Sequence, residues 1–259
     1  MSKARGSLLV LVSAGILLSV YLMSAHRTAP PVPAEPVTQA PPAPADQPPT
    51  RYVLDAEPQS EPLPALGVSD DAMKAALQTL WANGRLELFR FDNLIRRVVA
   101  TVDNLPRREL SERLRPFAPA PGQFRTAAQD GDLTISPENR ERYRRYVELA
   151  KVADAAKVVA VYAHFYPLFQ QAYADLGYPN GHFNDRLIEV IDHLVAAPEL
   201  PEHARLAQPK VFYHFADADL QQRSAGEKIL MRMGNENAAA IKAKLREIRA
   251  ELVRRSRAQ

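Results

Sequence analysis

Apolar residues follow three different patterns along the 259-residue chain. Residues 8–25 are eighteen successive positions without a charge, residues 26–64 hold few large apolar side chains, and residues 65–259 repeat apolar positions with the 3.6-residue period of amphipathic helices. These patterns predict a cytoplasmic tail (1–7), a transmembrane helix acting as a signal anchor (8–25), a proline-rich disordered linker (26–64) and a helical domain (65–259).

The apolar run 8–25 is long enough to cross a bilayer. As a helix it spans about 27 Å, at ~1.5 Å per residue, which is close to the roughly 30 Å hydrocarbon core. Lys3 and Arg5 precede the run, so the positive-inside rule places the N-terminus in the cytoplasm. The alternative is a cleaved signal peptide, but Met23 and Arg27 stand where a small residue would precede cleavage. We therefore expect an uncleaved anchor and an exported C-terminal domain.

The linker is dominated by proline. Twelve of the 22 prolines of the chain lie between Pro30 and Pro64. Proline fixes φ and lacks a backbone N–H, so this composition favours polyproline II over helix or sheet. At ~3.1 Å per residue the segment could extend roughly 100 Å. Its role is either to reach the cell wall or a partner, or to act as a generic solvated linker.

The domain that follows carries repeated helix-start signals and striped apolar positions. A second helix is expected to keep its period from Leu88 to Leu105, and Pro167 predicts a kink or a break in a later helix. The predicted starts are Ser69 with two following acids, Ser136–Glu138, Asp154, Asn184 or Asp185, and a capping box at Ser224–Glu227, while Ile241, Leu245, Ile248 and Leu252 stripe the last helix.

Few segments read as strands. Residues 117–136 contain two glycine turns and predict a loop with one hairpin, and residues 211–215 are the other short apolar run. The expected fold class is therefore all-α, with about seven or eight helices and at most a short β-hairpin.

Composition removes several kinds of chemistry. The chain has no cysteine, which excludes disulfides, cysteine nucleophiles, thiolate metal sites and a lipidated cysteine anchor. The net charge is +3, with basic residues concentrated near the C-terminus. Three of them, Lys242, Arg246 and Arg249, form a candidate basic surface for anionic lipid headgroups or an acidic partner. The alternative is a docked helix with a charged exterior. Nucleic acid is not an expected partner on the exported side.

A cluster of aromatic and amide residues is the most suggestive candidate for binding. The candidate groove consists of Tyr166, Gln170, Tyr173, Tyr178, Asn184, Asp185 and Arg186. Aromatic rings beside amides suit a peptide or a glycan. The alternative is that the rings belong to the core and the amides cap the neighbouring helix.

No catalytic, metal or cofactor site is assigned. Asp185, Glu189 and His193 share one helix face, but acids alternating with leucines usually form the solvated side of a helix. Ser224 and Lys228 do not have the S-x-x-K spacing of a serine–lysine nucleophile, and capping already explains Ser224.

Four segments resemble a proteobacterial membrane-anchored family catalogued only as a domain of unknown function. They are VDNLPR (102–107), YPLFQQAYADLGYP (166–179), FNDRLIEVIDHL (183–194) and SAGEKILMRMGNENAAAIKAKLREIR (224–249). The resemblance covers nearly all of residues 65–259. It implies an N-terminal membrane segment, a proline-rich stretch and this domain, and no catalytic residues.

The function expected from these features is a binding or scaffolding role in the cell envelope. The protein would be a single-pass protein of the bacterial inner membrane, with its N-terminus cytoplasmic and its C-terminal domain periplasmic. An envelope protein or a cell-wall component would be its partner, and its oligomeric state is left open. The alternative is an envelope hydrolase acting on peptidoglycan, and we favour the non-enzymatic role.

Overall fold

The computed structural model of the protein describes residues 51–54, 62–81, 85–129 and 131–258. All of these belong to one compact unit, Gln47–Gln259. The predicted tail and anchor (1–7 and 8–25) lie outside the described residues, as does most of the predicted linker. None of the helices within the described ranges is both long and apolar enough to cross a membrane.

The described part of the chain is mostly helical, as the sequence predicts. Its α-helices, eight within the described ranges, are α2 (Asp70–Leu80), α3 (Leu94–Asn104), α4 (Asn139–Val152), α5 (Ala155–Asp175), α6 (Phe183–Val195), α7 (Ala218–Gln222), α8 (Ala225–Arg232) and α9 (Asn235–Arg255). Short 3-10 turns occur at Leu66–Val68, Arg85–Leu88 and Glu112–Leu114.

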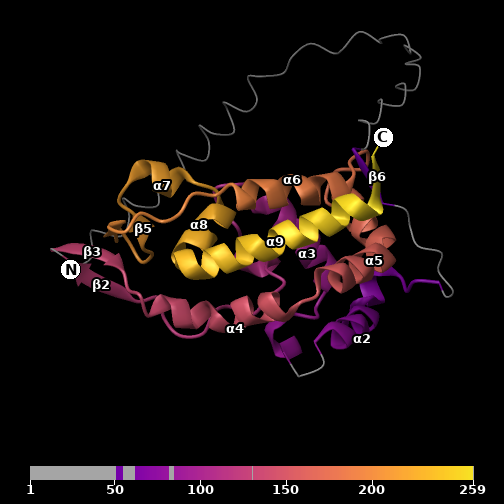
Figure 1. Ribbon diagram of the computed structural model, residues 1–259, viewed down its shortest axis with the longest axis horizontal. Coiled ribbons are helices and arrows are strands. Elements are labelled where there is room, and N and C mark those ends of the chain that lie inside the picture. The colour runs from indigo at the N-terminus through magenta and orange to yellow at the C-terminus, as the bar shows by residue number, and fades with distance from the viewer. Residues whose placement is uncertain (1–50, 55–61, 82–84, 130, 259) are drawn as a thin grey trace, which may run out of the picture. The chain divides into compact units, whose positions relative to one another are not determined.

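Helix α9 is a central packing element. It contacts α4, α5, α6 and α8, and Figure 1 shows it lying across α5 between α4 and α6. The predicted stripe faces inward: Leu252 is fully buried among Val159, Ile188 and Ile191, and Ile241 and Leu245 pack against the main core. Burying each large apolar side chain contributes about 1.5–3 kcal/mol. The striped face therefore fastens the C-terminal helix to the rest of the domain.

Helix α3 begins later than the periodicity predicts. The apolar period starts at Leu88, but Arg85–Leu88 forms a 3-10 turn and the α-helix starts only at Leu94. Asn93 adopts a left-handed conformation (φ 61°) that interrupts the helix. The Asp70 carboxylate accepts hydrogen bonds from the backbone N–H groups of Asn93 (2.6 Å) and Leu94 (2.8 Å). A side chain from another helix thus satisfies donors that the first turn of a helix leaves free.

Helix α5 continues through Pro167, so of the predicted kink or break the break does not occur. Proline removes one backbone donor and crowds the preceding turn. Packing compensates, because Phe165, Leu168 and Phe169 on both sides of the proline are buried in the main core. The predicted N-cap of this helix is confirmed, since the Asp154 carboxylate accepts a hydrogen bond from the backbone N–H of Lys157 (3.1 Å).

The β-structure exceeds the single short hairpin allowed by the sequence analysis. Strands β2 (Thr126–Gln129) and β3 (Asp132–Ile135) form the predicted hairpin, and β4 (Leu206–Ala207) pairs antiparallel with β5 (His214–Phe215). The hairpin strand β3 meets the chain at Arg205 through a bridge at Thr134. Regular strands this short leave no clear alternation in sequence, which explains the underestimate.

A third strand pair joins the two ends of the described chain. Strand β1 (Tyr52–Leu54) runs antiparallel to β6 (Ser256–Ala258), with Tyr52 opposite Ala258 and Leu54 opposite Ser256. Figure 1 shows β6 at the C-terminal end of α9, away from β2, β3 and α7. The pairing adds to the folded unit residues that the sequence analysis assigns to the linker.

Candidate functional site

The turn between α5 and α6 brings the candidate groove residues together. Gln170 on α5 donates from Nε2 to the Gly181 carbonyl (2.7 Å), and its Oε1 accepts the backbone N–H of Phe183 (2.9 Å). The same Oε1 accepts a hydrogen bond from the Tyr166 hydroxyl (3.3 Å). This amide therefore holds the beginning of α6 to α5.

The aromatic rings of the candidate groove lie largely inside the domain. Tyr173 is buried and stacks on Tyr178, with ring centroids 4.7 Å apart. It also contacts Phe183, whose ring is fully buried and stacks on Phe169. Burial raises the pKa of the Tyr173 hydroxyl, and the nearby Asp103 carboxylate raises it further. Tyr173 thus belongs to the main core, and the half-buried Tyr178 packs against it. A binding role for these residues remains a prediction.

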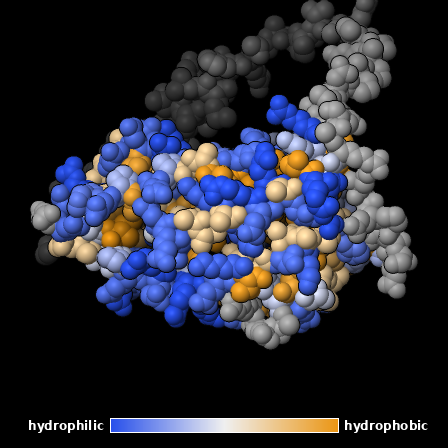
Figure 2. Space-filling model, in the orientation of Figure 1, coloured by the Kyte–Doolittle hydropathy of each residue, from blue (hydrophilic) through white to orange (hydrophobic). Residues whose placement is uncertain are grey.

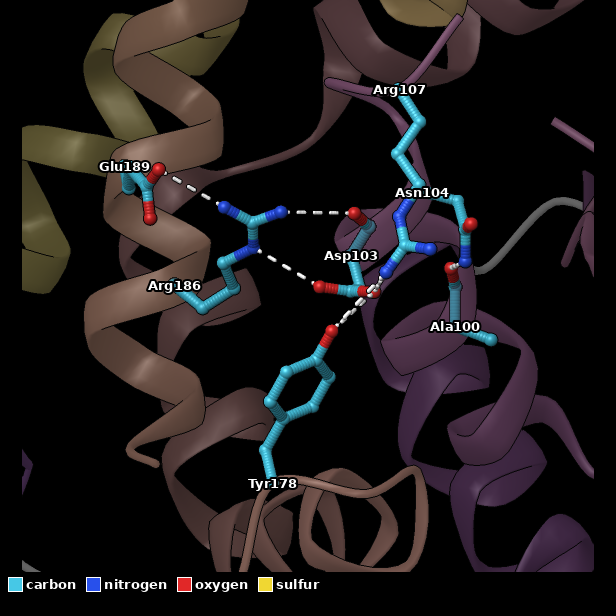
Figure 3. Close-up of polar contacts among 7 residues, drawn as sticks. All are labelled: Ala100, Asp103, Asn104, Arg107, Tyr178, Arg186 and Glu189. Carbon is cyan, nitrogen blue, oxygen red and sulfur yellow. Dashed lines mark hydrogen bonds and ion pairs between the residues drawn. The ribbon is translucent and has the colours of Figure 1, made fainter. Parts of the chain in front are cut away.

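Asp103 is the centre of a buried polar network (Figure 3). Its side chain is 3% exposed. One carboxylate oxygen accepts a hydrogen bond from Arg107 (2.6 Å) and one from the Tyr178 hydroxyl (3.3 Å). Arg186 lies on the other side, with Nε 3.3 Å from the second oxygen and Nη2 donating to the Asp103 carbonyl (3.0 Å). Three separate elements, α3, α6 and the α5–α6 turn, meet at this carboxylate.

The electrostatics of this network favour a fixed structural role. Burial lowers the pKa of Arg186, but its hydrogen bond to Glu189 and the charges of Glu189 and Asp103 outweigh burial and leave the pKa raised. Arg186 therefore stays protonated and Tyr173 stays neutral at ordinary pH. Groups that keep their charge states do not transfer protons. Such a network instead holds the helices in place.

Asp103 and Arg107 are site residues that the sequence reasoning missed. Both lie in VDNLPR, four residues apart, the spacing at which an acid and an arginine pair on a helix, although α3 ends at Asn104 and Arg107 lies beyond it. That spacing was the available signal. It is common on solvated helices, and burial of the acid is visible only once α6 packs beside α3.

The first turn of α6 fastens both terminal strands. Asn184 is fully buried, and its Nδ2 donates to the Tyr52 carbonyl (3.0 Å) and to the Ser256 hydroxyl oxygen (3.1 Å). Asp185 accepts the backbone N–H groups of Arg51 (3.0 Å) and Tyr52 (2.9 Å). We call Asn184, Asp185 and the β1–β6 pair the terminal clamp. Residues predicted to line a groove are thus occupied in closing the fold.

The three residues of the candidate basic surface differ in their surroundings. Lys242 donates to the Ala197 carbonyl, and Arg249 forms an ion pair with Asp192 on α6. Arg246 is exposed. Two of these cations therefore help dock α9 on α6. Binding of lipid or an acidic partner by all three remains a prediction.

The residues weighed for a metal site take different partners. Asp185 holds the β1 backbone, Glu189 pairs with Arg186 (3.0 Å), and His193 contacts Ser224. Across the described ranges, no group of three or more His, Asp or Glu side chains is arranged to hold a metal ion.

The predicted capping box at the start of α8 is confirmed. The Ser224 hydroxyl oxygen accepts the backbone N–H of Glu227 (3.1 Å), and the Glu227 carboxylate accepts the backbone N–H of Ser224 (2.9 Å). Burial raises the pKa of Glu227, but hydrogen bonds from Ser224 and Arg223 and the charge of His193 outweigh burial and leave it lowered. The carboxylate is therefore held ionised.

A serine–histidine contact adjoins this cap. His193 Nε2 lies 2.9 Å from Ser224 Oγ, a distance compatible with a nucleophile and its base. Ser224 is buried, however. The backbone N–H of Ala225 donates to the Arg107 carbonyl (2.6 Å), and that of Gly226 donates to the Leu105 carbonyl (2.9 Å). These amides are thus not free to stabilise an oxyanion. The contact serves the helix cap.

Two surface hollows lie away from the candidate groove. One, of about 530 Å³, lies between the α4–α5 junction and α9, and another, of about 280 Å³, lies between α3 and α5. Charged side chains line both, and none of the seven groove residues does. Figure 2 shows one face on which apolar side chains form small groups separated by polar ones.

Comparison with known proteins identifies a family and no individual relative. No curated protein matches this chain, and no solved structure matches it. Residues 94–249, more than half of the chain, match the family described as "Protein of unknown function (DUF3014)", and the chain therefore belongs to this family.

Proposed function

We propose that this chain is a single-pass inner-membrane protein that carries a binding or scaffolding domain in the periplasm. The charge-free run 8–25 and the cations Lys3 and Arg5 before it support the anchor and its orientation. The prolines of the following segment support a spacer between membrane and domain. An envelope protein or a cell-wall component would be the partner.

The terminal clamp is the observation that carries the proposal. Strand β1 lies within the predicted linker, after nine of its twelve prolines, and Asn184 and Asp185 hold it to β6 and to the buried start of α6. If the tether joined the domain through a peptide without hydrogen bonds, the first residues of the domain could unfold locally. Here β1 is paired with β6 and hydrogen-bonded to α6, which suits a domain held at the end of a spacer.

The contacts of the acids favour binding over hydrolysis. Glycoside hydrolysis uses two carboxyl groups across a cleft, one of which keeps its proton because its pKa is raised. Asp103 and Glu189 share Arg186, and Asp185 is occupied by backbone donors. The pKa of Glu251 is lowered to about 2 by hydrogen bonds from Arg254 and Arg255. Glu251 is therefore held in the form opposite to that of a general acid, while Asp103, Asp185 and Glu189 are engaged by arginine or backbone donors.

Incubation of the purified full chain with cell-wall sacculi separates the two functions. A binding domain releases no soluble wall fragments, and a photo-crosslinker placed on its surface gives discrete adducts in cells. A hydrolase releases fragments in proportion to time and protein concentration. Such release, absent from a heat-denatured control, would overturn the proposal in favour of the hydrolase.

A further inference from the structure

Four cations gather where the chain after α3 meets α8. Lys228 and Arg232 lie four residues apart on α8, and Arg108 and Arg115 come from the segment after α3. Lys228 reaches that segment directly, because its Nζ donates to the Arg108 carbonyl (2.9 Å). We call these four residues the cation cluster.

The two cations on α8 have no acidic partner. Lys228 Nζ makes its second hydrogen bond to the Gln221 carbonyl (3.2 Å), and Arg232 Nη2 donates to the Tyr213 carbonyl (3.1 Å). The Arg232 guanidinium also lies over the Phe215 ring, 5.6 Å from its centroid. Neither side chain forms an ion pair with a described Asp or Glu. Carbonyls and a ring orient these charges without neutralising them.

The other members of the cluster add to the charge. Arg115 has a buried Nε without a hydrogen-bond acceptor, and its Nη1 lies 3.5 Å from Glu112. Burial lowers the pKa of Arg232; the neighbouring Tyr143 offsets part of this, and the charge of Arg115 again lowers the pKa. Burial likewise lowers the pKa of Lys228, as do the charges of Arg232 and Arg108. The cations therefore repel one another, and Glu109 offsets only part of the repulsion at Lys228.

Partly buried like charges without a counter-ion destabilise a fold unless something neutralises them. A group with two negative charges and several acceptor oxygens would offset the repulsion and accept hydrogen bonds from the one ammonium and the guanidinium groups of the cluster. We propose that the cation cluster is a binding site for a phosphate group. This rests on the proposed function, because it gives the chemical class that the envelope domain recognises.

An apolar loop tip lies near the cluster. Val211 and Phe212, 78% and 77% exposed, precede Tyr213, whose carbonyl accepts the hydrogen bond from Arg232. Exposed neighbouring apolar side chains suit an amphiphile. The phosphate could thus belong to a lipid headgroup or be a free phosphate, and these sources share the chemistry of the site.

A phosphate titration tests the site directly. The full chain is reconstituted in phosphatidylcholine nanodiscs and titrated with inorganic phosphate at constant ionic strength, with sodium chloride as the balancing salt. We expect saturable binding, weakened about tenfold or more by Lys228→Gln because a charged donor is lost. Lys151→Gln, at an exposed lysine outside the cluster, should bind as the natural chain does. A response equal to that of chloride, or equal titrations of the two variants, overturns the proposal.

Arg232→Gln provides a second variant, and circular dichroism reports whether it folds. If it does not, the Lys228→Gln titration decides alone. A lipid source predicts that nanodiscs containing phosphatidylglycerol compete with inorganic phosphate and that Phe212→Ser relieves the competition. A free phosphate source predicts no effect of nanodisc composition. Either result supports the phosphate site. If the phosphate site fails, the proposed envelope location still stands or falls on protease accessibility, which tests it separately.

Discussion

The fully buried side-chain amide of Asn184 donates a hydrogen bond to the carbonyl of Tyr52, 132 residues earlier in the chain. The same amide nitrogen reaches Ser256. One side chain therefore holds the first and the last described strands in register.

Replacing Asn184 with Ala should loosen the terminal clamp. It leaves a buried carbonyl and a hydroxyl without their donor, and we expect the free energy of unfolding to fall by about 3 kcal/mol. Urea denaturation of the full chain measures the loss. Asn180→Ala, in an exposed turn, serves as the matched control and should change stability by less than about 0.5 kcal/mol. Equal effects of the two changes would show that the hydrogen bonds of Asn184 do not stabilise the terminal clamp.

The two arginines that contact Asp103 should contribute unequally. Arg186 is 20% exposed and Arg107 is 55% exposed at the side chain. Arg186→Ala leaves a buried carboxylate short of its main neutraliser and should cost about 3 kcal/mol. Arg107→Ala should cost about 1 kcal/mol, because water screens that pair. The reverse order in a thermal or urea titration would show that Arg107 is the principal partner.

The free energy of unfolding of the domain should decrease as the pH is lowered below about 4.5. The folded-state pKa of Glu251 is about 2, against an ordinary value of 4.5, and that of Glu227 is also lowered. A depressed carboxyl pKa stabilises the fold above the unfolded pKa, and this stability is lost as pH falls from about 4.5 towards the folded pKa. Unfolding measured between pH 6 and 3 should show this loss, and Glu227→Gln should show a shallower one. An unchanged slope in the variant would argue against the cap as its source.

Asn93 offers a test of why α3 starts late. Its left-handed backbone suits Asn and Gly, so Asn93→Gly should leave stability within about 0.5 kcal/mol. Asn93→Val should lower it by about 1–2 kcal/mol, because a β-branched side chain is strained there. The difference between their urea midpoints is the measurement. If Val were tolerated as well as Gly, the strained turn would not be what delays the helix.

Local signals predicted most of the helices. The α9 stripe and the Ser224–Glu227 capping box depend on neighbours within a few residues, and the structure confirms both. The start of α3 was missed because an acceptor from α2, Asp70, takes the donors at its first turn. The possibility of a break at Pro167 was wrong. It rested on the low helix propensity of proline, and the sequence does not show how the neighbouring residues pack in the core.

Long-range contacts were beyond sequence reasoning. Strands β1 and β6 have three residues each and come from opposite ends of the described sequence, so neither carries a pairing signal of its own. The residues of the candidate groove lie near one another because the α5–α6 turn connects neighbouring parts of the sequence. Their partners Asp103, Tyr52 and Ser256 come from elsewhere, and those partners decide how the polar groups are used.

Limited proteolysis of spheroplasts tests the central claim, a periplasmic domain fastened to its membrane tether, most directly. A protease added outside should cut the full chain within residues 26–50 and leave a resistant fragment that begins before Tyr52, while intact cells should protect the chain. Mass spectrometry gives the fragment ends. A chain that resists until the inner membrane is lysed would contradict the topology, and a fragment beginning after residue 62 would contradict the terminal clamp.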